Sequence, residues 1–342
     1  MALNIKDHNR SKYFVILKIW VIWYNTHDSQ RLKGGLLMKT KSLVNAAMMM
    51  AVYLVFFILY NIGILPSIMT FLLPIPLVIY SFVSQKISDI LLLLVGCLVG
   101  TYLIGSVYGL MTTLLYGVMG TLLGIGMVKG WPYWNRILNA SIVFVVVMPL
   151  TTYILTKLSM SEMFLDIMNE MFGMVSQVEG LMPEDSISQL MMMQEMMQTF
   201  IPMLMPTLLL IMGGVEAFIS DKIATQVLKR MKVQIPEIQP ISEFQLGSKL
   251  AILLIISQLM MMFITHQGLT VIFLNVAMLL NTLFMIQGAI VAIQFFHSRN
   301  QKGLGVMLVV LAILSNLVTF ISIIGMMDAL FDYRKRFLIK GV

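Results

Sequence analysis

The stretch "LLLLVGCLVGTYLIGSVYGLMTTLLYGVMGTLLGIGMV", residues 91–128, decides the fold because it contains no Asp, Glu, Lys, Arg or His. A helix of a water-soluble domain needs a polar face, whereas a membrane-spanning helix needs about twenty mostly apolar residues. The stretch is long enough for two such helices, and the glycines between Gly105 and Gly109 favour a tight turn. The sequence therefore predicts two membrane spans here.

The composition extends this conclusion to most of the chain. Of the 342 residues, 59% are hydrophobic and 11% are charged, whereas about a quarter of a typical soluble domain is charged. In hydrocarbon the backbone must satisfy its own hydrogen bonds, which leaves α-helices or closed β-barrels. The apolar runs do not alternate with polar residues as barrel strands do, so we expect an all-α, polytopic integral membrane bundle.

Eight or nine hydrophobic segments are expected to form this bundle. They cover residues 43–62, 66–83, 90–105, 108–128, 138–158, 199–220, 250–265, 269–296 and 304–327. Pro66, Pro74 and Pro76 predict that the second segment is kinked or broken. Basic residues occupy alternate loops, so the positive-inside rule predicts a cytoplasmic amino terminus and accounts for the net charge of +7 without nucleic acid.

The end of the chain leaves two topologies open. Arg299 and Lys302 fit a cytoplasmic loop, yet nine full spans would place the basic tail outside. If one late segment is re-entrant or interfacial, eight spans bring the tail back inside. We favour this second arrangement.

The chain divides into four expected parts. Residues 1–37 are either a translated leader, with Met38 as the true start, or an interfacial amino-terminal helix. Residues 38–230 form a six-helix bundle that carries an outer amphipathic connector, residues 159–198, with two helices. Residues 231–248 are a cytoplasmic linker with two prolines, and residues 249–342 hold the last membrane helices and the basic tail.

The sequence contains no pattern for catalysis, a cofactor or a metal site. Cys97 is the single cysteine, the four histidines are widely separated, and no phosphate or dinucleotide loop follows a strand. The 33 methionines, with "MMMQEMM" at 191–197, raise the alternative of copper, but their scattered use favours flexible gap-filling. The glycines of "GVMGTLLGIG" are expected to let helices approach closely. We therefore expect neither an enzyme nor a metalloprotein.

Polar side chains inside the spans are the candidates for function, because each is costly in lipid and turns toward the bundle. The candidates for ligand binding are Asn45, Asn275, Asn281 and Gln287. The alternative for each is a structural hydrogen bond between helices. Glu216, near the inner end of its segment, is interpreted as a carboxylate that reaches the membrane interface.

Four stretches resemble the YybS-like family of multipass membrane proteins from low-GC Gram-positive bacteria. They are "PIPLVIYSF" (74–82), "IPEIQPISEFQL" (235–246), "LLNTLFMIQGAIVAIQFF" (279–296) and "GMMDALFDYRKR" (325–336). The last stretch is the most specific, and its motif residues are Gly325, Asp328, Asp332, Arg334, Lys335 and Arg336. The resemblance implies a location in the bacterial cytoplasmic membrane.

That family is distantly similar to the substrate-binding S components of energy-coupling-factor transporters. S components are six-helix proteins that capture a vitamin or metal and dock on a shared transmembrane and ATPase module. The resemblance implies that the small residues Ala47 and Ala51 on the first helix contact such a partner subunit. The extra carboxyl-terminal helices and the long outer connector depart from a minimal S component.

Three functions follow as expectations. The first is an S-component-like subunit that binds a small solute and relies on partner subunits for energy. The second is a membrane scaffold that recruits cell-envelope proteins through its basic loops and tail. The third, a stand-alone secondary transporter, is disfavoured because such proteins place ionisable groups near the midplane and the spans hold almost none.

Overall fold

The computed structural model describes residues 35–176, 184–233, 235, 240–264, 266–315 and 317–334. The expected leader, residues 1–37, lies almost wholly outside this range, and Lys335 and Arg336 lie outside it completely. Within the described residues every regular element is a helix and none is a strand. The all-α expectation is therefore confirmed.

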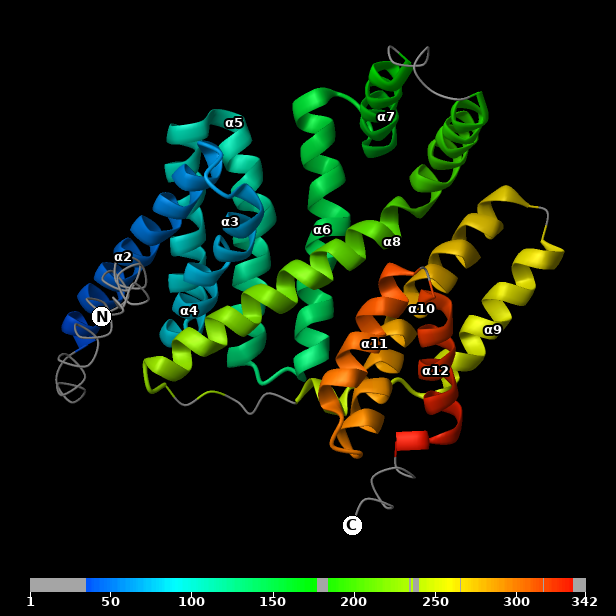
Figure 1. Ribbon diagram of the computed structural model, residues 1–342. Helices are drawn as coiled ribbons and strands as arrows, with labels where there is room; N and C mark the ends of the chain where they lie inside the picture. The colour runs from blue at the N-terminus through cyan, green and yellow to red at the C-terminus, as the bar shows by residue number, and fades with distance from the viewer. Residues whose placement is uncertain are drawn as a thin grey trace, which may run out of the picture. The chain divides into compact units, whose positions relative to one another are not determined.

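Packing divides the chain into two compact units, described here one at a time (Figure 1). Unit 1 comprises Met1–Val143 and Gly214–Pro236, and unit 2 comprises Phe144–Gly213 and Glu237–Val342. Unit 1 contains α2 (Gly35–Asn61), α3 (Pro66–Leu72), α4 (Ile75–Ser84), α5 (Ile87–Val128), the start of α6 (Tyr133–Thr156) and the end of α8 (Glu184–Arg230). Unit 2 contains the rest of α6 and α8, with α7 (Met160–Ser176), η3 (Ile241–Glu243), α9 (Ser248–Phe263), α10 (Gln267–His297), α11 (Lys302–Leu314) and α12 (Val318–Phe331).

Six helices of the described residues are long and apolar enough to cross a membrane. They are Ser42–Asn61, Pro66–Ser84, Ile87–Val128, Tyr133–Thr156, Ile187–Arg230 and Gln267–His297. Their lengths exceed the roughly twenty residues that a bilayer requires, or come close to it. The expectation of a polytopic membrane protein is therefore supported by the structure.

The α5 segment is a hairpin of two spans. Its backbone leaves helical geometry at Gly105 and at Ser106, where φ is 53°. The hydroxyls of Thr101 and Thr113 lie 2.8 Å apart, although twelve residues of straight helix would separate them by about 18 Å. A side chain at Gly109 would collide with the Thr101 carbonyl, so glycine permits this tight return. The predicted turn is confirmed.

The core of unit 1 is α4, which is buried along its whole first two turns. Residues 75–82 are all buried, and the preceding helix α3 ends before Pro74, as the prolines predicted. Helix α5 presents Gly120 to the Pro74 backbone and Gly124 to Ser81, so that no Cβ separates the two helices. The expectation that these glycines allow close helix approach is confirmed, and the broken helix is covered by protein as lipid requires.

The outer connector differs from the expected pair of helices. The first helix, α7, forms as expected and begins with a capping box: Ser159 Oγ accepts the Glu162 backbone N–H, and Glu162 accepts that of Ser159. These bonds hold the pKa of the Glu162 carboxyl below its ordinary value. The second helix is not separate, because residues 190–201 contain no glycine or proline to end it, and it continues as α8 to Arg230.

The ninth apolar segment, residues 304–327, is two short helices and not one. The break falls at residues 315–317, and α11 and α12 have 13 and 14 residues. Each is therefore about 20 Å long, against a hydrocarbon core of about 30 Å. Neither helix is long enough to span, and the expected single ninth helix is corrected to a helical hairpin.

Contacts with α10 fix the direction of both arms of this hairpin. Gly305, near the start of α11, packs against Ile293 and Phe296 near the end of α10. Further along, α12 places Ser322 beside Asn281 of α10, and then continues in the same direction as α10. The hairpin thus enters and leaves on the side of the α10 carboxyl end, with its tip level with the middle of α10. This geometry favours the re-entrant alternative, in which the tail shares a side with Arg299.

We predict that Gly120→Ala destabilises the protein by about 1–3 kcal/mol, because the added methyl group meets the Pro74 backbone, which cannot rotate away. Thermal unfolding of the purified protein in detergent measures the effect. The matched control is Gly173→Ala in α7, where nothing lies within 4 Å. That control should be neutral or stabilising by up to about 1 kcal/mol, and equal melting temperatures for the two variants would refute the proposed α4–α5 contact.

Candidate functional site

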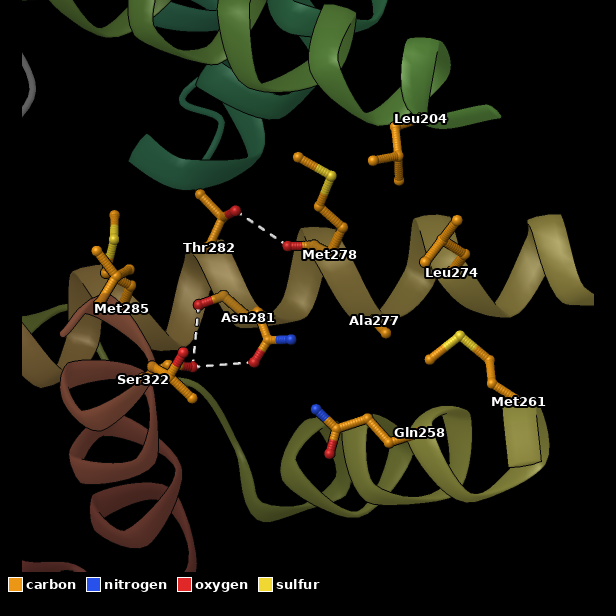
Figure 2. A pocket seen from close by; sticks show the side chains of 12 residues that line it. Leu204, Gln258, Met261, Leu274, Ala277, Met278, Asn281, Thr282, Met285 and Ser322 are labelled. Atoms are coloured by element: carbon orange, nitrogen blue, oxygen red, sulfur yellow. Dashed lines mark hydrogen bonds between the residues drawn. The ribbon is translucent and has the colours of Figure 1, made fainter. Parts of the chain in front are cut away.

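A cavity of about 390 Å³ lies in unit 2 at the tip of the α11–α12 hairpin (Figure 2). Most of its wall comes from α9, α10 and α12, and α8 adds one leucine. The lining residues are Leu204, Gln258, Met261, Leu274, Ala277, Met278, Asn281, Thr282, Met285, Val318, Thr319 and Ser322. Its size falls in the usual range of small-molecule sites, about 300–1,000 Å³.

The polar groups of the cavity are amides and hydroxyls, and none of its lining residues is ionisable. Ser322 of α12 donates its hydroxyl to Asn281 of α10, with 3.1 Å to both the backbone oxygen and Oδ1. Figure 2 shows Asn281 and Gln258 pointing toward one another from α10 and α9. An Asn amide retains two N–H donors when its oxygen is engaged. The cavity can therefore offer donors to a neutral solute beside an apolar wall.

Beyond the cavity, a buried ion pair at the end of α12 is hydrogen-bonded to α10. Asp328 is fully buried in α12, and Arg334 donates to it from Nε and from its backbone N–H, both at 3.0 Å, while Arg334 Nη2 lies 2.9 Å from Asp328 Oδ2. Gln287 of α10, also fully buried, donates Nε2 to Asp328 at 2.8 Å. The Asp328 carboxylate thus accepts hydrogen bonds from Gln287 of the neighbouring helix α10 and from Arg334, which follows α12 in the chain.

This network also binds the end of the expected linker. Gln287 accepts the backbone N–H of Leu246 at 2.8 Å, so its amide bridges the linker and Asp328. The Ser242 carbonyl receives Arg334 Nη1 at 3.0 Å and Gln294 Nε2 at 2.9 Å. Three of the four stretches that carry the family resemblance, residues 235–246, 279–296 and 325–336, meet here. We call this set of bonds the Asp328 network.

Two glycines set the separation of α10 and α12 between the cavity and the Asp328 network. A Cβ at Gly288 would collide with the Ile321 carbonyl, and a Cβ at Gly325 would collide with the Phe284 carbonyl. The small residues therefore allow the two backbones to touch, as in membrane helix pairs. Gly325, a motif residue, serves this contact, whereas Asp332 of the motif accepts Gln245 Nε2 at 2.7 Å.

Asn275 does not line the cavity and instead bonds a weakened turn of α8. Pro206 cannot donate a backbone hydrogen bond, which weakens the helix around it. Asn275 Nδ2 donates to the Met203 carbonyl at 2.7 Å, and its Oδ1 accepts Thr207 Oγ1 at 2.7 Å and Thr207 N at 3.2 Å. The carboxamide thus engages both ends of one helical turn.

The other predicted residues lie on α2 in unit 1. Asn45 is partly buried, and its Oδ1 has no hydrogen-bond partner among the described residues. Ala47 and Ala51 are exposed. They lie in the middle of a stripe of exposed apolar residues along one helix face, which also includes Val44, Val55 and Ile58. Two alanines between larger side chains make a shallow hollow, a surface suited to another helix.

Sequence reasoning missed a second buried ion pair, in unit 1. Arg136 of α6 lies 2.9 Å from both carboxylate oxygens of Asp221 in α8, and both side chains are buried. Tyr133 packs against the Arg136 guanidinium, with 5.3 Å to the ring centroid. The available signal was an arginine at the start of one apolar segment and an aspartate at the end of the next, 85 residues away.

No group of three or more His, Cys, Asp or Glu side chains in the described part of the chain could hold a metal ion. Cys97 is buried, and burial makes a thiol unreactive. The geometry on which a chemical function can rest is therefore the uncharged cavity and the buried polar networks.

We predict that Asp328→Asn destabilises the protein by about 3–5 kcal/mol, because Arg334 is then left charged and buried without its partner. Thermal unfolding in detergent provides the measurement, and Glu243→Gln, an exposed acid on the same linker end, is the control. A combined Asp328→Leu and Arg334→Met variant should recover much of the loss, because no charge is then buried. An Asp328→Asn protein as stable as the control would contradict the role of the network.

Comparison with known proteins adds a family. No curated protein and no solved structure matches the chain. The family model described as "Predicted membrane protein (DUF2232)" matches residues 49–329, which include α2 from its middle, the cavity and Asp328. Because this match covers well over half of the sequence, the chain belongs to the DUF2232 family of membrane proteins.

Proposed function

We propose that this protein is a solute-binding subunit of a membrane transporter and that the solute occupies the cavity at the tip of the α11–α12 hairpin. The observation that carries the proposal is the cavity itself, level with the middle of α10 and lined by five uncharged polar residues among apolar ones. Binding sites of membrane transporters lie near the midplane, where interrupted helices expose polar groups. The hairpin tip is such an interruption.

The lining selects the class of solute. A charged molecule would find no counter-charge among the lining residues, which disfavours its binding there. Asn281, Gln258 and Thr319 offer hydrogen bonds, whereas Met261, Met278 and Met285 supply a flexible apolar wall. The solute is therefore a neutral small molecule with a polar end and an apolar body.

We also propose that the protein is related in function to YybS-like proteins and to S components, which dock on partner subunits. The stripe on α2 around Ala47 and Ala51 is the surface on which a transmembrane coupling subunit would dock. The sequence contains no nucleotide-binding loop, so ATP hydrolysis would come from further partner subunits. The cavity lies in unit 2, and all its lining residues except Leu204 come from helices after the first six apolar segments, which is a departure from the S-component pattern.

The scaffold function remains the alternative, and the exposed lysines of unit 1 favour it. Lys129, Lys229 and Lys232 are exposed near the ends of α5 and α8. The motif at the carboxyl end contributes less to such a role than the sequence suggested, because Asp328 and Arg334 bind each other. A scaffold would bind cell-envelope proteins and would need no solute.

We predict that a small neutral molecule remains bound to the protein purified in mild detergent, and that Asn281→Leu abolishes this binding. The leucine removes the amide and fills part of the cavity. Native mass spectrometry measures the bound mass, with Gln226→Leu, an exposed amide in unit 1, as the control. A parent protein without any bound small molecule, or an Asn281→Leu protein that retains it, would argue against the solute site.

A second prediction concerns the docking stripe. Affinity purification in mild detergent should recover a transmembrane coupling subunit and ATPases with the parent protein. Replacing both Ala47 and Ala51 by leucine should reduce this recovery at least tenfold, because the hollow between the larger side chains is filled. Val95→Leu with Val99→Leu, an exposed apolar pair on α5, is the control. Recovery of cell-wall or division proteins in place of ATPases would support the scaffold.

A further inference from the structure

Glu216 is an acid inside a membrane-spanning helix, and it has no basic partner. It lies on α8, within the stretch Ile187–Arg230 that is long and apolar enough to cross a membrane. The buried ion pairs of the described residues join Arg136 to Asp221 and Arg334 to Asp328, and neither includes Glu216. A carboxylate inside such a helix is costly, so it marks a functional site by default.

The neighbours of Glu216 are hydroxyl groups from three helices of unit 1. Thr70 of α3 lies beside the carboxyl, and Tyr60 of α2 and Tyr116 of α5 are its electrostatic neighbours. The two tyrosine rings pack edge to face, with centroids 6.5 Å apart. Among the charged and titratable groups of α2, α3, α5 and α8, tyrosines alone face the carboxyl. The nearest lysine on its own helix, Lys222, lies over Tyr133 and Phe218 instead.

One oxygen of the Glu216 carboxyl is isolated from hydrogen-bond partners. The Thr70 hydroxyl donates to the Ser67 carbonyl at 3.1 Å, which leaves its oxygen able to accept a proton from a neutral carboxyl. The second oxygen, Oε2, is buried without a hydrogen-bond partner. A neutral C=O group tolerates this isolation far better than a carboxylate does.

A route to water leads from the outer ends of the helices. Tyr60 lies next to the last residue of α2 and close to Tyr108, which comes just after the α5 turn. Tyr108 is 50% exposed, and the turn at residues 62–65 beside it is exposed too. These tyrosines connect Glu216 to the end of unit 1 that the positive-inside rule assigns to the outside.

We propose that Glu216 is a proton-binding site within the membrane and takes up its proton from the outer side past Tyr108 and Tyr60. In the step, a hydronium ion of the outer water gives one proton to a carboxylate oxygen of Glu216 and becomes a neutral water molecule. One O–H bond breaks in the hydronium ion and one forms on the carboxyl, which changes from charge −1 to neutral and donates its new O–H to Thr70 Oγ1. The site goes beyond the solute cavity, because it lies in unit 1 and needs no solute to be filled.

Infrared difference spectroscopy of the full-length protein in lipid nanodiscs tests this proposal directly. A protonated carboxyl in apolar surroundings has a C=O stretching band that shifts in deuterium oxide, and it should be present at acidic pH and lost as the pH is raised. Glu216→Gln should remove the band, whereas Glu170→Gln, which changes an exposed acid of α7, should retain it. Absence of the band from the parent, or its persistence in Glu216→Gln, would overturn the proposal.

Two further measurements follow. The first tests the geometry of the site in a variant that keeps the carboxyl, and the second tests whether the bound cation is a proton or a metal ion. Thr70→Val should shift the band to higher frequency without removing it, because the carboxyl loses its hydrogen-bond acceptor. Exchange of potassium for sodium at constant pH should leave the band unchanged. Loss of the band in sodium would assign the site to a metal cation and reject the proton, and an unshifted band in Thr70→Val would reject the assigned geometry.

Discussion

At several places in the described residues where a helix ends or is weakened, a side chain from another helix bonds the backbone groups there. Lipid offers no water for this purpose, so the requirement that the protein itself bonds these groups is stricter than in a soluble domain. Where α3 ends, Ser220 of α8 donates to the Phe71 carbonyl at 2.9 Å. Where Pro206 weakens α8, Asn275 engages Met203 and Thr207. Where the linker meets the membrane helices, Gln287 accepts the Leu246 N–H.

This constraint explains how the polar residues of the spans divide by role. Asn275 and Gln287 have their amides engaged within the protein, at a helix turn and in the Asp328 network. Asn281 has its oxygen engaged by Ser322 and lines a cavity with the rest of its amide. The three residues are uncharged amides on the same helix, α10. Their roles differ because the backbone opposite each one differs.

The sequence predicted the parts of the fold that local signals determine. The turn after Gly105 and the break before Pro74 were visible because glycine and proline mark them within uncharged runs. The break at residues 315–317 carries no such residue, and the segment around it has the length of a full span. The second connector helix was drawn as separate, although nothing in residues 190–201 can end a helix.

The site was harder to predict because its contacts are distant in sequence. Asn281 meets Ser322, and Gln287 meets Asp328, each across 41 residues, while Asn275 meets Met203 across 72. An amide inside an apolar segment is expected to face protein and not lipid. The sequence does not show, however, which distant segment of the chain packs against it. The Arg136–Asp221 pair was missed for the same reason, since each residue alone resembles an interfacial charge.

The arrangement of α10 and α12 connects the close packing of these two helices to the cavity beside it. At Gly288 and Gly325 the two backbones touch, and the Asp328 network fixes their register from the linker side. A buried ion pair adds little net stability relative to apolar side chains, but it penalises every register that separates its charges. The helices are thus held at one end by contacts that tolerate no displacement. Toward the tip, Ser322 still joins α12 to Asn281 of α10, and methionines of α9 and α10 line the wall beside this bond. The register that the glycines and the Asp328 network impose therefore also places the polar groups of the cavity.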